Sequence, residues 1–354
     1  MRSITIILVA VLFTFCTRKE KEIIRNFSKV KVETLLQDSI QVRAIAIYKD
    51  TLLGYGFNRG YGFMNLKTHK NVMIDFAMSD TIKDRKNWAT EYRAVAFTEN
   101  SFLCLGIGSP ARLRSIDLKS REERIVYTET HEKIFYNALA FWDSNEGIAM
   151  GDPVDGCMSI LITRDGGDTW KKLSCDVLPK TIEKEAAFAA SNTNIAVKGD
   201  KAWVVSGGAK SRVFYTADRG KTWKVFTTPI VEGQETTGIY SVAFRTENDG
   251  TIFGGDYLSP DGNRSNKAMT KDGGKTWQLI ADTTEPGYKS CVQYIPNSNG
   301  RQIVAAGFTG ISISNDYGQT WKEISKEKFY TIRFLNDTTA IAAGSKRIAK
   351  VTFQ

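Results

Sequence analysis

The residues of this sequence that could do chemistry are arginines, aspartates and tyrosines beside short apolar segments. Arg43 and Arg93 each stand second in such a segment, and Asp152, Asp256 and Tyr257 each follow one closely. A guanidinium group can pair with a carboxylate, and aromatic rings beside paired charges suit recognition of a protein or a glycan. The set indicates a binding surface if the fold brings its members together, whereas any one of them alone can be a solvated loop residue.

Other kinds of chemistry find less support. The two histidines, His69 and His131, lie in unrelated contexts, which argues against a His-rich zinc site, a two-histidine iron site and histidine-based catalysis. The run Gly106-x-Gly108-x-x-Ala111 superficially matches a dinucleotide-binding pattern. Pro110 and the alternation from 113 to 116 favour another strand at that point instead of a phosphate-binding helix. We therefore expect no metal and no cofactor.

Four copies of one octapeptide predict how these residues are positioned. The copies share the pattern [ST]-x-D-x-G-x-T-W and occupy 163–170, 216–223, 270–277 and 314–321. The pattern is typical of a β-hairpin turn, in which the Asp carboxylate accepts backbone hydrogen bonds and the Gly supplies a positive φ. The Trp is expected to pack against the neighbouring repeat. We interpret these residues as structural: Asp165, Trp170, Asp218, Trp223, Asp272, Trp277, Asp316 and Trp321.

A second unit recurs seven times and consists of a short apolar strand, a polar turn and a strand that ends in a small residue. Its first strands are predicted at 42–47, 92–97, 136–141, 186–190, 240–244, 291–294 and 330–334. The units average about 47 residues, which is close to the period of propeller blades. No long segment shows a helical period. We therefore predict an all-β fold, a single seven-bladed β-propeller over 29–354.

The two ends of the chain are predicted to complete the last blade together. The seventh unit ends at the C-terminus without a fourth strand, while residues 29–36 alternate in hydrophobicity before the first unit begins. Pairing of this N-terminal strand with the C-terminal blade would leave no open sheet edge there.

The first residues have the pattern of an exported protein. Arg2 precedes an apolar run at 4–15, which ends at Cys16. Twelve helical residues span about 18 Å, less than the roughly 30 Å of a hydrocarbon core, so a signal peptide is favoured over a transmembrane helix. The run resembles a bacterial lipobox, although Phe15 stands where a small residue is usual. We predict a lipoprotein-type signal peptide at 1–16 with lipidation of Cys16, a polar tether at 17–28 and a lipid-anchored place in the cell envelope; secretion after cleavage and a retained anchor are the alternatives.

The remaining cysteines suggest one disulfide. Cys157 and Cys175 are equidistant from Gly166, the middle of a predicted hairpin turn. A symmetric register would place them opposite each other on two antiparallel strands, within disulfide reach. The alternative is a pair of buried thiols, which is what we expect of Cys104 and Cys291.

Composition excludes some partners. A formal net charge of +9 would suit nucleic acid, but the basic residues are scattered and the expected compartment is outside the cytoplasm. Charged residues make up 25% of the chain and hydrophobic residues 42%, which is typical of a folded globular body. We expect a monomer that does not bind nucleic acid.

The octapeptides resemble the Asp-box, or BNR, repeat. The chain is similar to the Asp-box β-propellers, most closely to the photosystem II stability/assembly factor-like group, and the resemblance covers nearly all of the mature chain. Asp-boxes are poor guides to activity, because sialidases, xyloglucanases, sorting receptors and assembly factors all carry them. In those relatives the Asp-boxes lie opposite the usual ligand face. The resemblance therefore implies a site on the loops that follow the second strand or precede the first strand of each unit.

Two functions remain open for that face. The leading hypothesis is a non-catalytic envelope scaffold that binds a protein partner; the alternative is a glycan-binding protein or a sialidase-like glycoside hydrolase. Sialidases clamp a carboxylate with three arginines and carry a Tyr-Glu nucleophile pair. Arg43, Arg93 and Arg212 could lie near the mouth, but neither an Arg-Ile-Pro motif nor a Tyr-Glu pair is identifiable. The candidate binding residues are Arg43, Arg59, Tyr92, Arg93, Asp152, Arg212, Tyr240, Asp256 and Tyr257.

Overall fold

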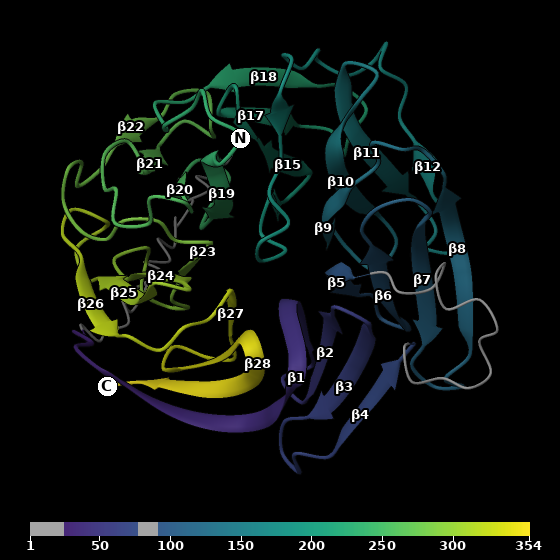
Figure 1. Ribbon diagram of the computed structural model, residues 1–354, viewed down its shortest axis with the longest axis horizontal. Helices are drawn as coiled ribbons and strands as arrows, with labels where there is room; N and C mark the ends of the chain where they lie inside the picture. The colour runs from purple at the N-terminus through teal and green to yellow at the C-terminus, as the bar shows by residue number, and fades with distance from the viewer. Residues whose placement is uncertain (1–24, 77–90) are drawn as a thin grey trace, which may run out of the picture.

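The computed structural model describes residues 25–76 and 91–354. Within these ranges the regular structure consists of strands alone, and no helix is present. Figure 1, viewed down the shortest axis of the molecule, shows the sheets standing around a central axis. The predicted all-β propeller fold is therefore confirmed.

The strands of the described ranges form six hydrogen-bonded sheets. Their bounds, in sheet order, are β27 (Thr331–Phe334), β28 (Thr339–Phe353), β1 (Val30–Tyr48), β2 (Leu52–Phe57), β3 (Gly60–Asn65) and β4 (Asn71–Asp75); β5 (Tyr92–Phe97), β6 (Ser101–Gly106), β7 (Ala111–Asp117) and β8 (Glu123–Glu129); β9 (Tyr136–Phe141), β10 (Gly147–Val154), β11 (Cys157–Thr163) and β12 (Lys171–Lys172); β14 (Ile195–Lys198), β15 (Lys201–Val205), β17 (Arg212–Thr216) and β18 (Lys224–Thr227); β13 (Glu185–Ala186), β16 (Gly207–Gly208), β19 (Thr237–Phe244), β20 (Gly250–Asp256), β21 (Lys267–Thr270) and β22 (Gln278–Leu279); β23 (Cys291–Tyr294), β24 (Ile303–Gly307), β25 (Gly310–Ser314) and β26 (Lys322–Ser325).

The six sheets correct the prediction of seven separate blades. The 19-residue strand β1 pairs with β28 from Val30 to Gln41 and with β2 from Val42 to Tyr48. Two of the predicted units therefore share one continuous strand and belong to one sheet. The pairing of Val30 with Phe353 confirms that the N-terminal strand closes the C-terminal end of the fold. Figure 1 shows the purple strand β1 beside the yellow strand β28.

A ring of inner strands surrounds the axis. Contacts run from β1 to β5, β9, β14, β19, β23 and β27 and return to β1. Apolar side chains of adjacent sheets pack between them, as where Ala94 and Leu103 meet Leu139 and Ala149. Burial of one such large side chain contributes about 1.5–3 kcal/mol. The inner strands are thereby held rigidly, with their first residues at one end of the axis.

The segment 187–194 departs from the predicted strand pattern. Its apolar residues were expected to form an inner strand, but β14, which occupies that place, begins only at Ile195. Asn192 instead bridges two neighbouring sheets, since its Nδ2 donates to the Val95 carbonyl of β5 and its Oδ1 accepts from the Leu139 N–H of β9. Ser191 Oγ donates to the Ser290 carbonyl at 2.6 Å. This axial segment (187–194) therefore ties several sheets together near the centre.

The four octapeptides form turns with one shared set of hydrogen bonds. In the second copy, Asp218 Oδ1 accepts from the Thr222 N–H at 2.8 Å and from the Lys221 N–H at 3.0 Å, while Oδ2 accepts from the Thr222 hydroxyl at 2.6 Å. Gly220 has a φ of +86°, where a side chain would be strained. Trp223 Nε1 donates to the Gly220 carbonyl, and its ring packs on the preceding sheet. These turns have the geometry that the sequence pattern predicts.

The N-terminal predictions lie largely outside the described residues. The proposed signal peptide (1–16), Cys16 and residues 17–24 of the expected tether all fall there. The last tether residues, 25–28, contact the body of the propeller, and Phe27 is 6% exposed in a cluster with Ile313 and Phe353. In the described residues no helix is long and apolar enough to cross a membrane.

Candidate functional site

A cavity of about 560 Å³ opens where the inner strands begin, at the end of the axis opposite the octapeptide turns. We call it the mouth cavity. It is lined by Arg43, Arg93, Phe135, Asp152, Ala186, Ala187, Phe188, Ala189, Ala190, Glu235, Tyr240, Tyr257, Tyr288, Phe308 and Tyr330. Its lining comes from the start of inner strands, from loops after second strands and from the axial segment, so that residues far apart in sequence meet there.

Stacked aromatic rings form one wall of the mouth cavity. The Phe188 and Tyr240 rings are stacked with centroids 4.0 Å apart, and Tyr288 meets Tyr240 edge-on at 4.8 Å. Tyr257, 42% exposed, stands at the rim with its ring 6.4 Å from that of Tyr240. The Tyr240 hydroxyl donates to the Thr236 carbonyl at 2.7 Å, which fixes the ring. Such a preformed aromatic wall suits an apolar or aromatic group of a ligand.

Two arginines make another part of the lining basic. The Arg43 guanidinium lies 4.0 Å from the centroid of the Tyr330 ring, and it makes no ion pair or hydrogen bond within residues 25–76 and 91–354. Loss of solvent, and then the charge of nearby Arg93, lower the pKa of Arg43. Arg93 Nε instead donates to Glu91 Oε2 at 2.6 Å. Arg43 is thus a half-buried cation, and an anionic group of a ligand could serve as its partner.

Asp152 places a carboxyl group in the same cavity. Its Oδ1 accepts from Asn137 Nδ2 at 2.8 Å and from the Ala187 N–H at 3.0 Å. Burial outweighs these hydrogen bonds and raises the pKa of Asp152 to about 6. The cavity therefore contains an acid whose charge changes just below neutral pH.

Five of the nine candidate residues line the mouth cavity: Arg43, Arg93, Asp152, Tyr240 and Tyr257. The other four serve the fold. Arg59 Nε donates to Asp75 Oδ2 at 2.9 Å, and Asp256 Oδ1 accepts from the Leu258 N–H at 2.9 Å. Tyr92 is buried, and its hydroxyl accepts from Arg114 Nε at 2.7 Å. Arg212 pairs with the buried carboxylate of Glu185, so the three arginines considered for a sialidase site are not gathered in one pocket.

Several lining residues were not among the candidates. Phe135, Phe188, Phe308 and Tyr330 line the mouth cavity without having been assigned to it. An aromatic residue stands at or just before the first strand of most units; this signal put Tyr92 and Tyr240 among the candidates but was not applied to Phe135 and Tyr330. Phe188 was missed because 186–190 resembled an inner strand.

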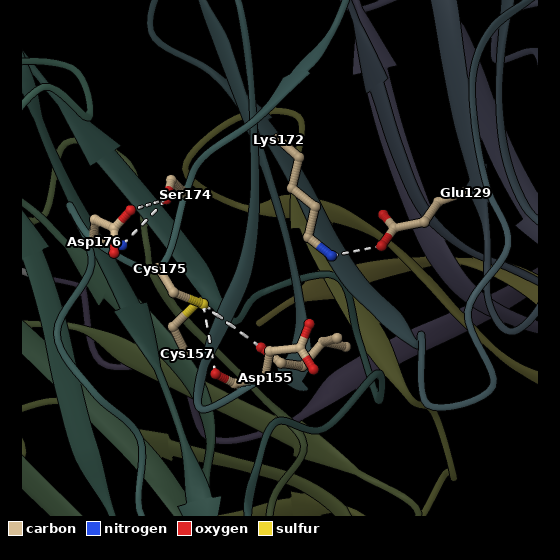
Figure 2. The surroundings of a disulfide bond; sticks show 8 residues. Glu129, Asp155, Cys157, Lys172, Ser174, Cys175 and Asp176 are labelled. Atoms are coloured by element: carbon tan, nitrogen blue, oxygen red, sulfur yellow. Dashed lines mark hydrogen bonds and ion pairs between the residues drawn. A yellow bond between two sulfur atoms is a disulfide. The ribbon is translucent and has the colours of Figure 1, made fainter.

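The disulfide between Cys157 and Cys175 is present, with the two Cα atoms 5.5 Å apart. It does not arise from the continuous ladder that the equal spacing suggested, because β12 contains only Lys171 and Lys172. Figure 2 shows Cys175 in the loop beyond β12, close to Asp155. The bond therefore fixes the start of the loop that leads to the axial segment. Cys104 and Cys291 are buried thiols, as expected.

Within residues 25–76 and 91–354, no three His, Cys, Asp or Glu side chains are grouped so that they could hold a metal ion.

The architecture is that of a β-propeller with a ligand-sized cavity at one end of its axis. The Sortilin-Vps10 family model (sortilin, neurotensin receptor 3) matches residues 158–306, which is less than half of the chain. No curated protein matches the chain.

Similar solved structures agree on a propeller of this kind. YCF48 bound to D1 peptide has a TM-score of 0.65 at 13% identity, covering 93% of this chain and 98% of that one. YCF48 from Cyanidioschyzon merolae has a TM-score of 0.60 at 14% identity, covering 90% and 98%. The WD40 repeats of RRP9 have a TM-score of 0.62 at 10% identity, covering 91% and 97%. At these identities the likeness establishes the fold alone.

Proposed function

We propose that this chain is a non-catalytic binding propeller that holds a segment of a partner protein in the mouth cavity. The observation that carries the proposal is Arg43, a half-buried guanidinium whose neighbours in the cavity are aromatic rings and a second arginine. A peptide with an acidic group beside an apolar or aromatic side chain complements both walls of this cavity.

The proposed class is the Asp-box propeller of the photosystem II assembly factor-like group. The four octapeptide turns with their common hydrogen bonds support it, as does the likeness to YCF48, a propeller solved with a peptide of D1 bound. We propose no role in photosystem assembly for this chain.

We further propose that the protein is exported and anchored in the cell envelope through lipid on Cys16. The sequence from Arg2 to Cys16 supports this. A glycan in the same cavity is the competing ligand, because tyrosine walls with nearby charges also suit sugars.

The test is binding of fluorescent heptapeptides that contain Asp or Glu next to Phe or Trp, compared with peptides in which Asn or Gln replaces the acid. We expect the acidic peptides to bind more tightly to the full-length protein. Arg43→Met should weaken their binding by roughly tenfold or more, since a charge-assisted hydrogen bond contributes about 1.5–3 kcal/mol.

Arg59→Met is the matched control, because Arg59 pairs with Asp75 and does not line the cavity. Thermal unfolding checks that both variants are folded. Equal binding of acidic and amide peptides, or unchanged binding by Arg43→Met, would contradict the proposal. If sialylated or acidic glycans bind to the wild type and not to Arg43→Met, the ligand of the cavity is a sugar and not a peptide.

A further inference from the structure

Glu235 is a charged residue of the mouth cavity that the proposed function leaves unused. It is exposed, and within residues 25–76 and 91–354 its carboxylate forms no ion pair or hydrogen bond. It lines both the mouth cavity and a neighbouring hollow of about 350 Å³, which we call the rim hollow. Lys184 also lines the rim hollow but not the mouth cavity, so Glu235 is the charged group that the two spaces share.

Hydrogen bonds on both sides of Glu235 hold the turn that carries it. Thr237 Oγ1 accepts from the Gln234 N–H at 3.1 Å and donates to the Gln234 carbonyl at 3.0 Å. The Tyr240 hydroxyl donates to the carbonyl of Thr236, the residue next to Glu235, at 2.7 Å. The carboxylate of Glu235 is therefore carried by a fixed backbone at the edge of the mouth cavity.

Glu235 and Arg43 lie on opposite sides of the mouth. Arg43 belongs to β1, whereas Glu235 lies just before β19. The ring of inner strands places β23 and β27 between β19 and β1 on one side, and β5, β9 and β14 on the other. Figure 1 shows β1 and β19 across the axis from each other. A ligand that spans the mouth can therefore meet a cation on one side and a carboxylate on the other.

Tyrosine rings lead from one charge toward the other. The Arg43 guanidinium lies 4.0 Å from the Tyr330 ring centroid, and it is close enough to Tyr288 for its charge to act on that hydroxyl. From the Tyr288 ring, steps of 4.8 and 6.4 Å between centroids lead through Tyr240 to Tyr257. An extended chain rises about 3.3 Å per residue, so three or four residues of a ligand cover these two steps.

The surroundings of Glu235 suit a lysine or arginine of the ligand. Leu258, which lines the rim hollow, is 71% exposed, and Tyr257 at the cavity rim is 42% exposed. The methylene stem of a basic side chain packs on such apolar surface while its charged head stays in water. A cation is also attracted by the face of a tyrosine ring. Glu235 supplies a carboxylate for the charged head.

We propose that the mouth cavity selects a dipolar segment of the partner protein, in which an acidic residue pairs with Arg43 and a basic residue three or four positions away pairs with Glu235. The stem of the basic residue lies along Tyr257 and Leu258. An aromatic or apolar residue between the two charges contacts the tyrosine rings of the cavity. The dipolar ligand rests on the proposed binding function, to which it adds the second charge and the spacing.

The test uses the full-length protein and fluorescent heptapeptides with Glu at the second position, Trp at the fourth and either Lys or Gln at the sixth. Peptides with the two outer positions exchanged cover the opposite chain direction. We expect Lys to strengthen binding to the wild type about two- to fivefold in one of the two directions, as for an ion pair at an exposed residue. Lys placed directly beside Glu should give no such gain, because it would lie too far from Glu235.

Reversal of the charge at Glu235 gives the sharper result. Glu235→Lys should abolish the gain from Lys and favour a peptide that carries Glu at both outer positions. Glu183→Lys is the matched control, because Glu183 is exposed and lines neither the mouth cavity nor the rim hollow. This control should keep the wild-type preference for Lys. Thermal unfolding checks that both variants are folded.

The outcomes separate the dipolar ligand from the binding function on which it rests. Binding of the Gln-containing peptide that is weakened by Arg43→Met supports the binding function alone. If that binding is found but Lys gives no gain, or if Glu235→Lys keeps the preference for Lys, the dipolar ligand is wrong and the binding function stands. Loss of the preference in Glu183→Lys as well would also overturn the pairing with Glu235. If none of the peptides binds to the wild type, both proposals are wrong.

Discussion

The two ends of the propeller axis differ, although the same strands lead to both: one end carries repeated structural turns and the other carries the candidate binding site. At the octapeptide end, four copies of one sequence form four copies of one turn, and the carboxylates of Asp165, Asp218, Asp272 and Asp316 each accept hydrogen bonds from within their own turn. At the mouth, the residues do not repeat. Arg43 and Asp152 are partly buried there, and burial disfavours the charged form of each side chain. The repeated residues are thus the ones that stabilise the fold, whereas the candidate binding site is made of residues that do not repeat.

The largest expected loss of stability comes from Arg212, which lies on the same side as the mouth cavity but stabilises the fold and does not line the cavity. Arg212 donates to both carboxylate oxygens of Glu185, whose side chain is fully buried. Arg212→Met leaves that carboxylate buried without its cation, so we expect a loss of about 3–5 kcal/mol of unfolding free energy. Urea unfolding followed by tryptophan fluorescence measures it.

Lys210→Met is the control for this prediction, because the pair of Lys210 with Glu232 is partly exposed and should contribute less than about 1 kcal/mol. If the Arg212→Met protein is as stable as the wild type but no longer binds peptide, Arg212 is a binding residue and its assignment to the fold alone is wrong.

The disulfide gives the next largest effect. Cys157→Ser with Cys175→Ser opens a loop closed over 18 residues of sequence, and we expect a loss of about 3 kcal/mol from chain entropy. Because the freed loop leads to the axial segment, which lines the mouth, peptide affinity should fall as well. Thermal unfolding and peptide titration measure the two effects, and reductant added to the wild type should reproduce them. Lost stability with unchanged affinity would show that the loop and the cavity wall are independent.

A substitution in an octapeptide turn should lower the stability of the protein and leave its peptide affinity unchanged. Asp218→Ala removes four hydrogen bonds within its turn, including one that the Thr216 hydroxyl donates. We expect a cost of about 2 kcal/mol, because turn N–H groups near the surface regain water. Lys221→Ala, an exposed change in the same turn, should cost less than about 0.5 kcal/mol. Peptide affinity of folded Asp218→Ala should match the wild type; a drop would mean that the two ends of the axis are coupled.

The same contrast explains what the sequence could predict. The turns follow from local rules, because the Asp, Gly and Trp of each octapeptide interact within a few residues. The disulfide was also predictable, although its chain path was not. By contrast, the pairing of Arg212 with Glu185 joins residues 27 apart, and no local pattern indicates it.

Two other features of the fold differ from the prediction because they depend on contacts between residues far apart in the sequence. The segment 186–190 has strand-like composition, yet it lines the mouth and most of it belongs to the axial segment, whose hydrogen-bond partners come from several sheets. The sharing of β1 by two units depends on pairing with residues more than 300 positions away. Properties that depend on closure of the ring could not be read from single units.

The smallest predicted effect tests the mouth directly. Asp152 has a pKa of about 6 in the folded protein, above the value of about 3.9 for an unfolded chain. The folded state therefore binds its proton more tightly, and the stability from this group is present below about pH 4 and is lost as the pH rises through 6. Asp152→Asn stays neutral, keeps an oxygen for the Ala187 N–H, and should stabilise the protein by about 1 kcal/mol at pH 7.

Binding should follow the same titration. Asp152 and Arg43 line one cavity, so removal of the negative charge should strengthen the binding of an acidic peptide at pH 7. At pH 5 wild-type Asp152 is mostly protonated, and the two proteins should bind that peptide equally well, because any titration of the peptide affects both alike. The measurement is the ratio of their affinities at the two pH values. A ratio that does not change with pH would mean that the Asp152 carboxyl does not sense the ligand, and that the ligand lies beyond this part of the mouth.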